Sequence, residues 1–342
     1  MAKISTKSPY FINSTVTNLD AVTLKLWIYT GTQTTDRPAL ATYTLISTAI
    51  NNNVMFEIGE LIGDFINTGF DGTYDTDLVW VDYTTTQTIL GVIGTESAYV
   101  QHYATKGYTY FEEGANYDSG NGSLITRGTV QRLSGQTYHV PYDNNQCVAY
   151  QKWINGSLNT FGNLNISLAD SSDQIIYMEV ASDVEKLIFT LADTSVNTIY
   201  FEDVEECKYT PHKITFLNKE GVLESMWMFK RSAVQTTMKS ETYMNNQINI
   251  NTNYNVNQHQ MNRINVTSNE QLSMNTGFIP ESSNEMMRQL LSSDEVYIDY
   301  NSQTLPINIK TEELLYKTRL DDKLINYGVK VDFAFNKINT VR

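Results

Sequence analysis

Alternation of apolar and polar residues dominates the chain and predicts β-strands. In residues 22–30, VTLKLWIYT, aliphatic side chains alternate with Thr, Lys, Trp and Tyr, which is the two-residue period of a strand. Short runs of this kind recur about every ten to fifteen residues, with turn residues between them. In residues 324–335, every second residue from Ile325 to Phe335 is apolar. This spacing is typical of an all-β protein rather than of alternating strands and helices.

Two segments have helical spacing instead. Near residues 55–66, apolar residues recur at three- and four-residue steps, which predicts an amphipathic helix. A second helix is predicted near residues 281–292, after Pro280 and with Ser282 or Ser283 as its cap. Its predicted buried stripe consists of Met286, Met287, Leu290 and Leu291.

The clearest hairpin lies in residues 213–230. Its turn contains Gly221, because a tight hairpin turn needs a residue that accepts positive φ. This hairpin opens a new unit, so we expect a domain boundary near residue 205. The sequence thus predicts a mainly β protein with two tandem domains, residues 1–204 and 205–342. Each would combine strands with one flanking amphipathic helix.

Residues 248–257, ININTNYNVN, alternate strictly. A flexible spacer would favour Gly and Ser here, whereas a two-residue period indicates a half-buried strand of about 30 Å. Asn is a poor strand former, so burial of the apolar face and pairing with a neighbour would have to hold the strand. The polar face of the predicted strand consists of Asn249, Asn251, Asn253, Asn255 and Asn257.

Composition and net charge limit the classes of function that fit the chain. Charged residues make up 18% of the chain and the formal net charge is −14, which argues against a general clamp for nucleic-acid phosphates. The same acidity suits a surface that DNA slides past without binding. Residues 1–11 lack an apolar signal core and no run approaches a membrane span, so we expect folding in a cytoplasm. Cys147 and Cys207 stand outside any CxxC motif, and we expect free buried thiols.

Candidate chemistry is sparse. The four histidines form no HExxH or Cys/His cluster, which argues against zinc. Carboxylates gather in residues 71–77, 112–113 and 202–206, and we interpret them as solvated loop acids rather than a glycosidase pair. Residues 116–123 alternate Asp, Asn and Gly as a calcium loop does, but lack the closing Glu of an EF-hand. We therefore expect no catalytic residue, no cofactor, no metal and no enzymatic activity.

Aromatic residues leave an alternative open. Side chains such as Tyr108, Tyr110, Phe111, Trp153 and the pair Trp227/Phe229 could stack on sugars in a lectin-like groove. On strands, however, aromatic residues more often belong to cores or interfaces. A carbohydrate-binding β-sandwich used for host attachment is the alternative function.

Residues 212–232, HKITFLNKEGVLESMWMFKRS, resemble a hairpin of tail and virion structural proteins of tailed bacteriophages, including Bacteroidota-infecting and crAss-like phages. The shared pattern is a strand ending in Phe-Leu-Asn, a turn with Gly, and an aromatic-rich strand with a basic end. Downstream, a helix and a long final strand follow in the same order. The resemblance covers roughly residues 205–342.

The resemblance implies a tail-tube-like β-sandwich or half-barrel. Such subunits form tail or tail-hub rings around a DNA channel, contact other tail or neck proteins, and reside in the virion after assembly in the host cytoplasm. Strand edges left open in one subunit would pair with its neighbours. The candidates are residues 324–335 and the strand that carries Asn249 to Asn257, whose Asn face is expected between subunits or toward the lumen.

Overall fold

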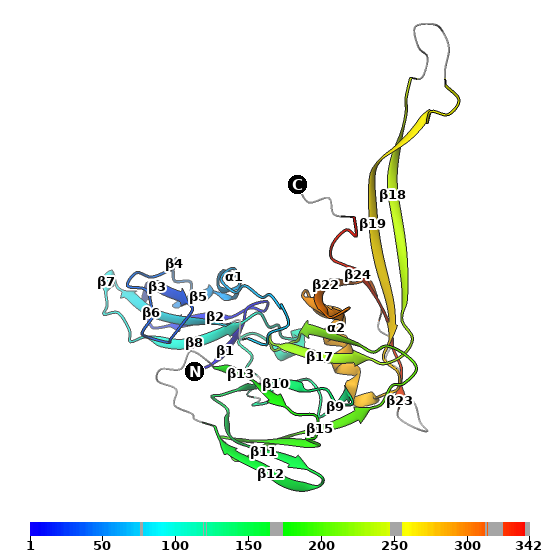
Figure 1. The fold of residues 1–342 in the computed structure, drawn as a ribbon. Coiled ribbons are helices and arrows are strands. Elements are labelled where there is room, and N and C mark those ends of the chain that lie inside the picture. The colour runs from blue at the N-terminus through cyan, green and yellow to red at the C-terminus, as the bar shows by residue number, and fades with distance from the viewer. Residues whose placement is uncertain are drawn as a thin grey trace.

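A computed structural model of the chain describes residues 1–75, 78–118, 120, 122–164, 174–246, 255–311, 313 and 324–338. The fold is mainly β and sandwich-like, with several sheets and, within these residues, two α-helices. Three larger sheets follow one another along the chain, and a long two-stranded ribbon projects from the third (Figure 1). The predicted mainly β class is confirmed.

The first sheet is built around two long antiparallel strands, β3 and β6. Its interior holds Leu24, Leu26 and Val81, all fully buried. A small sheet of β2 (Phe11–Thr15) and β5 (Asn53–Glu57) contributes Val54 and Phe56 to the same core. The spatial order is β1 (Lys3–Ser5), β8 (Val100–Thr105), β6 (Val79–Ile89), β3 (Leu19–Tyr29) and β4 (Tyr43–Thr48), with β7 (Val92–Ile93) also on β6.

The helix predicted near residues 55–66 is much shorter in the structure. The helix α1 spans Gly59–Gly63, and Phe56 lies instead in β5 (Asn53–Glu57), paired with β2 (Phe11–Thr15). The apolar residues here fit both a helical and a two-residue period. Pairing with β2 decides between them, because it satisfies the backbone hydrogen bonds of residues 53–57 while Phe56 still enters the core.

The middle of the chain forms a five-stranded sheet packed against the pair β10 (Tyr138–Asp143) and β13 (Ile175–Val180). Leu187, Phe189 and Ile199 point into this core and are at most 2% exposed. The spatial order is β12 (Ser157–Asn163), β11 (Cys147–Ile154), β14 (Lys186–Leu191), β15 (Val196–Val204) and β9 (Thr129–Leu133).

The third sheet has seven strands and carries α2 (Asn284–Ser292) on its apolar face. A short 3-10 turn (Glu281–Ser283) precedes α2. Of the predicted stripe, Met286, Met287 and Leu290 are fully buried, and Leu291 is half-buried against the same core. The hairpin of residues 213–230 is confirmed, with Gly221 at φ +75° in its turn. The order is β17 (Leu223–Met228), β16 (His212–Leu217), β21 (Val296–Tyr300), β22 (Gln303–Ile309), β24 (Gly328–Phe333), β19 (Met261–Asn275) and β18 (Ala233–Met244).

The strand predicted at residues 324–335 is split into β23 (Leu324–Ile325), which pairs with β20 (Ile279–Pro280), and β24. Its apolar face is buried as predicted from Ile325 to Phe333, with Val331 fully inaccessible, but Phe335 lies beyond β24 and is 40% exposed. The expectation that it leaves an open edge is wrong. In the structure β24 has β22 on one side and β19 on the other, so its main-chain groups are paired within the subunit.

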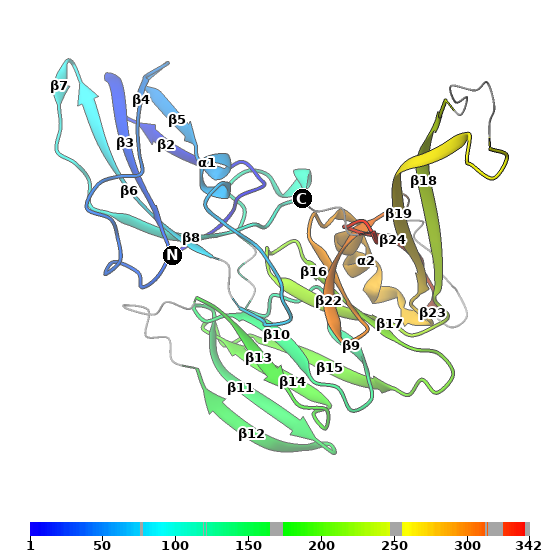
Figure 2. The ribbon, with the colours of Figure 1, turned by 45° about the horizontal axis from the view of Figure 1, so that its top comes forward.

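Apolar side chains form three large clusters rather than two. One lies within residues 4–104, one joins residues 130–204 to Trp227 and Phe229, and one lies within residues 214–333. The predicted boundary at 204/205 falls between β15 and β16. The region before it thus contains two sheets (Figure 2), each with a large cluster of its own, and β17 contributes to the second cluster. A smaller cluster that contains Trp80, Tyr103 and Ile175 joins the two sheets.

Candidate functional site

The most distinctive surface is the two-stranded ribbon of β18 and β19, called the arm below. β24 pairs with β19 only from Gln271 to Asn275, so the part of β19 before Gln271 pairs with β18 alone. All twelve residues of β18 are exposed. The arm extends well beyond the body of the subunit (Figure 1), and the outer edge of β18 has no neighbouring strand among the described residues.

Cross-strand pairs explain why this segment forms strands. The register runs from Ala233 opposite Ser273 to Met244 opposite Met261, with a bulge after Lys239. Above the bulge, the sequence SETYM contains two β-formers, and a bulge increases local twist. Two side-chain bonds cross the ribbon here. Arg263 Nε donates to Ser240 Oγ at 3.1 Å, and Asn265 Nδ2 donates to Glu241 Oε2 at 2.9 Å.

The arm exposes more apolar surface than a solvated ribbon needs. Met238 is 65% exposed and Met244 is 69% exposed, and neither contacts the cores. Met244 and Met261 are directly opposite one another on the two strands, and an exposed apolar patch on a projecting element is typical of a protein contact surface. The exposed apolar side chains of the arm are Val234, Met238, Tyr243, Met244, Met261 and Ile264.

The base of the arm is firmly held. Leu272 and Met274 are buried in the third core. The main-chain nitrogen of Lys337 donates to the carbonyl of Ser268 at 2.8 Å, and the Lys337 Nζ lies 3.2 Å from Glu270 Oε2. The chain after β24 therefore straps the base, and the tip of the arm is positioned from a fixed root.

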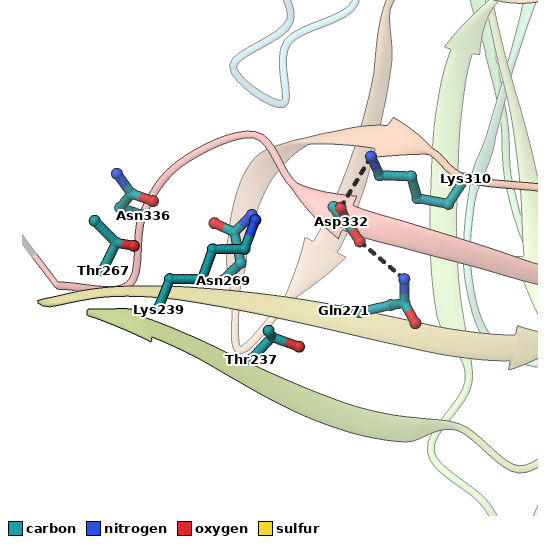
Figure 3. A pocket seen from close by; sticks show the side chains of 8 residues that line it. All are labelled: Thr237, Lys239, Thr267, Asn269, Gln271, Lys310, Asp332 and Asn336. Carbon is teal, nitrogen blue, oxygen red and sulfur yellow. Dashed lines mark hydrogen bonds and ion pairs between the residues drawn. The ribbon is translucent and has the colours of Figure 1, made fainter. Parts of the chain in front are cut away.

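A polar groove of about 360 Å³ lies where the arm leaves the sheet (Figure 3). Asp332 makes polar contacts with two other residues of the lining. Its Oδ1 accepts from Gln271 Nε2 at 3.1 Å, and its Oδ2 lies 3.3 Å from Lys310 Nζ. The lining has no thiol or imidazole, and its charged groups are the carboxylate of Asp332 and the amines of Lys239 and Lys310. Its lining residues are Thr237, Lys239, Thr267, Asn269, Gln271, Lys310, Asp332 and Asn336.

The structure describes only part of the strand whose polar face was predicted to consist of Asn residues. Asn249, Asn251 and Asn253 lie outside the described residues. Asn255 and Asn257 are exposed and belong to a turn, where the main-chain nitrogen of Asn257 donates to Asn255 Oδ1 at 3.0 Å. The prediction that the strand continues to residue 257 is therefore wrong at its C-terminal end. Asn side chains favour such local turns.

Sequence reasoning overlooked β18, although it is the exposed edge strand of the third sheet. Its sequence, AVQTTMKSETYM, is rich in Thr and contains Val and Tyr, which are strand formers. This composition is the feature of the sequence from which the strand could have been predicted. The apolar–polar alternation that identified other strands is weak here, because neither face of β18 enters a core.

Other candidate residues remain separate. Among the described residues no group of three or more His, Cys, Asp or Glu side chains could hold a metal ion. Cys147 is buried, and burial raises the pKa of its thiol to about 12. Cys207 is exposed, which corrects the expectation of two buried thiols. Trp227 and Phe229 are core residues, whereas Phe111 is almost fully exposed.

No helix in the described part of the chain is long and apolar enough to cross a lipid bilayer. No protein-family model matches the chain, and no curated protein matches it.

Proposed function

We propose that the protein is a virion structural protein of a tailed bacteriophage, a tail or tail-hub component that assembles into a ring around the DNA channel. The arm is the observation that carries this proposal. It is a long, exposed, apolar-bearing ribbon with an open strand edge.

The arm needs a partner for physical reasons. An isolated two-stranded ribbon is marginally stable in water, and an open edge invites pairing with another chain. At about 3.3 Å per residue, the twelve residues of β18 extend roughly 40 Å. A ribbon of that length can bury an area on the order of 800 Å² per partner, the size of a stable interface. Head-to-tail contacts between identical subunits would cover every arm once the ring closes.

The charge distribution also supports assembly. Residues 233–275 contain four charged residues that balance, Lys239 and Arg263 against Glu241 and Glu270, while the whole chain carries −14. A neutral arm can approach an acidic neighbour without the repulsion that the rest of the surface would meet. In this proposal the acidic remainder lets DNA pass without specific binding, and no residue has a catalytic role.

An arm-shortened variant tests the proposal. Lys239 and Thr267 are directly paired, so replacing residues 240–266 by Asn-Gly closes the ribbon with a two-residue turn that suits a hairpin. We expect this variant to keep the body folded, by circular dichroism and thermal melting, and to lose self-association in mass photometry and electron cryomicroscopy.

The matched control is Leu40→Ser, which removes an 83% exposed apolar side chain from a loop of the first unit and should leave association unchanged. The proposal is wrong if the full chain stays monomeric both alone and mixed with the other structural proteins of its particle. It is also wrong if the shortened variant assembles as the full chain does.

A further inference from the structure

A second surface, independent of the arm, lies on the outer face of the five-stranded middle sheet. Along β14 and in the middle of β15, residues buried in the core alternate with residues on this face. Leu187, Phe189 and Ile199 point inward and are buried. The residues between them point outward at the edge of the molecule, where β11 and β12 are outermost (Figures 1 and 2).

Strand register orders these outward side chains in two rows across the sheet, together called the outer platform. Trp153 and Tyr200 lie in the same row, with Lys186 between them as the cross-strand partner of both. The first row consists of Leu158, Trp153, Lys186, Tyr200 and Thr129, and the second of Phe161, Gln151, Ile188 and Thr198.

The platform exposes large side chains that a monomer would normally bury. Phe161 is 57% exposed, Tyr200 is 52% exposed and Leu158 is 48% exposed, and Trp153 is half-buried. Such a concentration of aromatic surface on one sheet face marks a binding surface.

Polar groups are interleaved with these rings. Lys186 Nζ lies 3.8 Å from the centre of the Trp153 ring, and Trp153 Nε1 donates to Gln151 Oε1 at 3.3 Å. At the rim, next to Tyr200, Gln131 Nε2 donates to Glu202 Oε2 at 3.3 Å. Amide, ammonium and carboxylate groups are thus within reach of anything that stacks on the rings.

This mixture distinguishes a glycan from a protein partner. The centres of protein interfaces are depleted in charged residues, Lys among them, yet Lys186 lies between the two central rings. A sugar has apolar C–H faces, which stack on aromatic rings, and hydroxyls, which need donors and acceptors at the ring edges. The platform supplies both in alternation.

We propose that the outer platform binds an extended glycan chain lying across the strands. Trp153 and Tyr200 are two strands apart, roughly 10 Å, so one chain can stack on both rings. Lys186 moves from the Trp153 ring to donate to a hydroxyl or acidic group of the sugar between them. Gln151 and Glu202 bind neighbouring hydroxyls, and Phe161 supports a second contact along the chain.

Intrinsic fluorescence offers a direct test on the full chain. Trp27, Trp80 and Trp227 are at most 5% exposed, so Trp153 is the tryptophan that a ligand on the surface can reach. The probes are hexasaccharides of β-1,4-linked glucose, of β-1,4-linked N-acetylglucosamine and of an acidic uronic-acid polymer. We expect a saturable change of emission with at least one of them, and no change in Trp153→Phe.

Variants separate the platform from a general effect. Tyr200→Ala and Phe161→Ala should each weaken binding about tenfold, because each removes a stacking ring. Val196→Ala, a 59% exposed position on β15 outside the two rows, is the control and should bind as the full chain does. All three positions are exposed, so unchanged melting temperatures are expected to verify folding.

The proposal is overturned if none of the three probes changes the emission and the protein is not retained on the corresponding immobilised polysaccharides. It is equally overturned if the emission changes with protein concentration alone, since a second copy of the chain then covers the platform. The arm-shortened variant should retain glycan binding, so this inference and the proposed assembly can fail separately.

Discussion

Arg127 and Glu224 bring opposite charges together in the interior of the protein. Arg127 Nε lies 3.9 Å from Glu224 Oε1, and the two side chains are 3% and 0% exposed. Neither atom has a hydrogen-bond partner. The other oxygen, Oε2, accepts from the nitrogen and hydroxyl of Thr126 and from Asn218 Nδ2. The pair thus joins the start of the middle unit to the hairpin of the third.

Removing one partner of this pair should be costly. Arg127→Met leaves the carboxylate of Glu224 buried without its counter-charge, so we expect a loss of about 3–5 kcal/mol in the free energy of unfolding. Urea denaturation measures it. The double variant Arg127→Met/Glu224→Gln should recover part of the loss, because it removes the orphaned charge.

Lys25→Met is the control for that experiment. Lys25 Nζ lies 2.9 Å from Glu96 Oε2, but both side chains are about two-fifths exposed, so the expected cost is at most about 1 kcal/mol. Equal losses in Arg127→Met and Lys25→Met would contradict the role assigned to the buried pair.

Acidification should destabilise the fold through His139. Its ring stacks on Tyr74 at 4.2 Å, and burial, followed by nearby Lys213, lowers its pKa, with Glu179 opposing the shift. The unfolded chain therefore takes up the proton at a higher pH than the folded chain does. Stability is complete above the ordinary His pKa of about 6.5 and falls as the pH drops below it.

Thermal melts of the full chain and of His139→Gln between pH 7.5 and roughly pH 5 measure this effect. We expect the melting temperature of the full chain to fall more steeply. Parallel curves would show that His139 does not contribute, because carboxylates, the half-buried His102 and the buried His212 titrate in both proteins.

The two cysteines should differ in reactivity. Burial, with a smaller effect of Asp143, raises the pKa of Cys147 to about 12, and a protonated buried thiol is a poor nucleophile. Cys207 is exposed. Iodoacetamide at pH 8 should label Cys207 alone in the folded protein and both thiols in urea, as read by peptide mass spectrometry. Rapid native labelling of Cys147 would contradict its burial.

Gly221 should be the less replaceable of two glycines with the same backbone angle. Gly221 and Gly91 both have φ +75°, but a Cβ at Gly221 would lie 2.7 Å from Thr105 Oγ1 and would also meet the main chain of Gly107, whereas one at Gly91 meets nothing within 4 Å. Gly91→Ala should cost about 1 kcal/mol from backbone strain alone. Gly221→Ala should cost more, by urea denaturation, and equal costs would mean that the approach to Gly107 is not tight.

Elements whose side chains face one core throughout were predictable from the sequence. The stripe of α2 and the alternation from Tyr327 to Phe333 both point at the third core, so local period and final environment agree. In residues 55–66 the period was ambiguous, and the partner strand β2 decided the outcome. No local pattern could reveal that β24 would be an internal strand, since that depends on β19 and β22.

The candidate sites were likewise predictable only where a local pattern of residues was sufficient. The sequence indicates Trp153 only as one aromatic residue among several, because its row with Lys186 and Tyr200 exists only through pairing of β11, β14 and β15. The arm was missed because a strand without a core has no apolar face to identify it, and β18 is exposed along its whole length.

The strand β17 is buried from end to end. Met226 and Met228 point into the third core, while Trp227 and the following Phe229 point into the middle one. The two faces of this one strand therefore belong to two different hydrophobic cores. If the chain were cut at residue 205, Trp227 and Phe229 would be exposed on the C-terminal fragment, and the middle core of the N-terminal fragment would have a cavity in their place. Residues 1–204 and 205–342 should therefore unfold in a single thermal transition, and neither should express well alone.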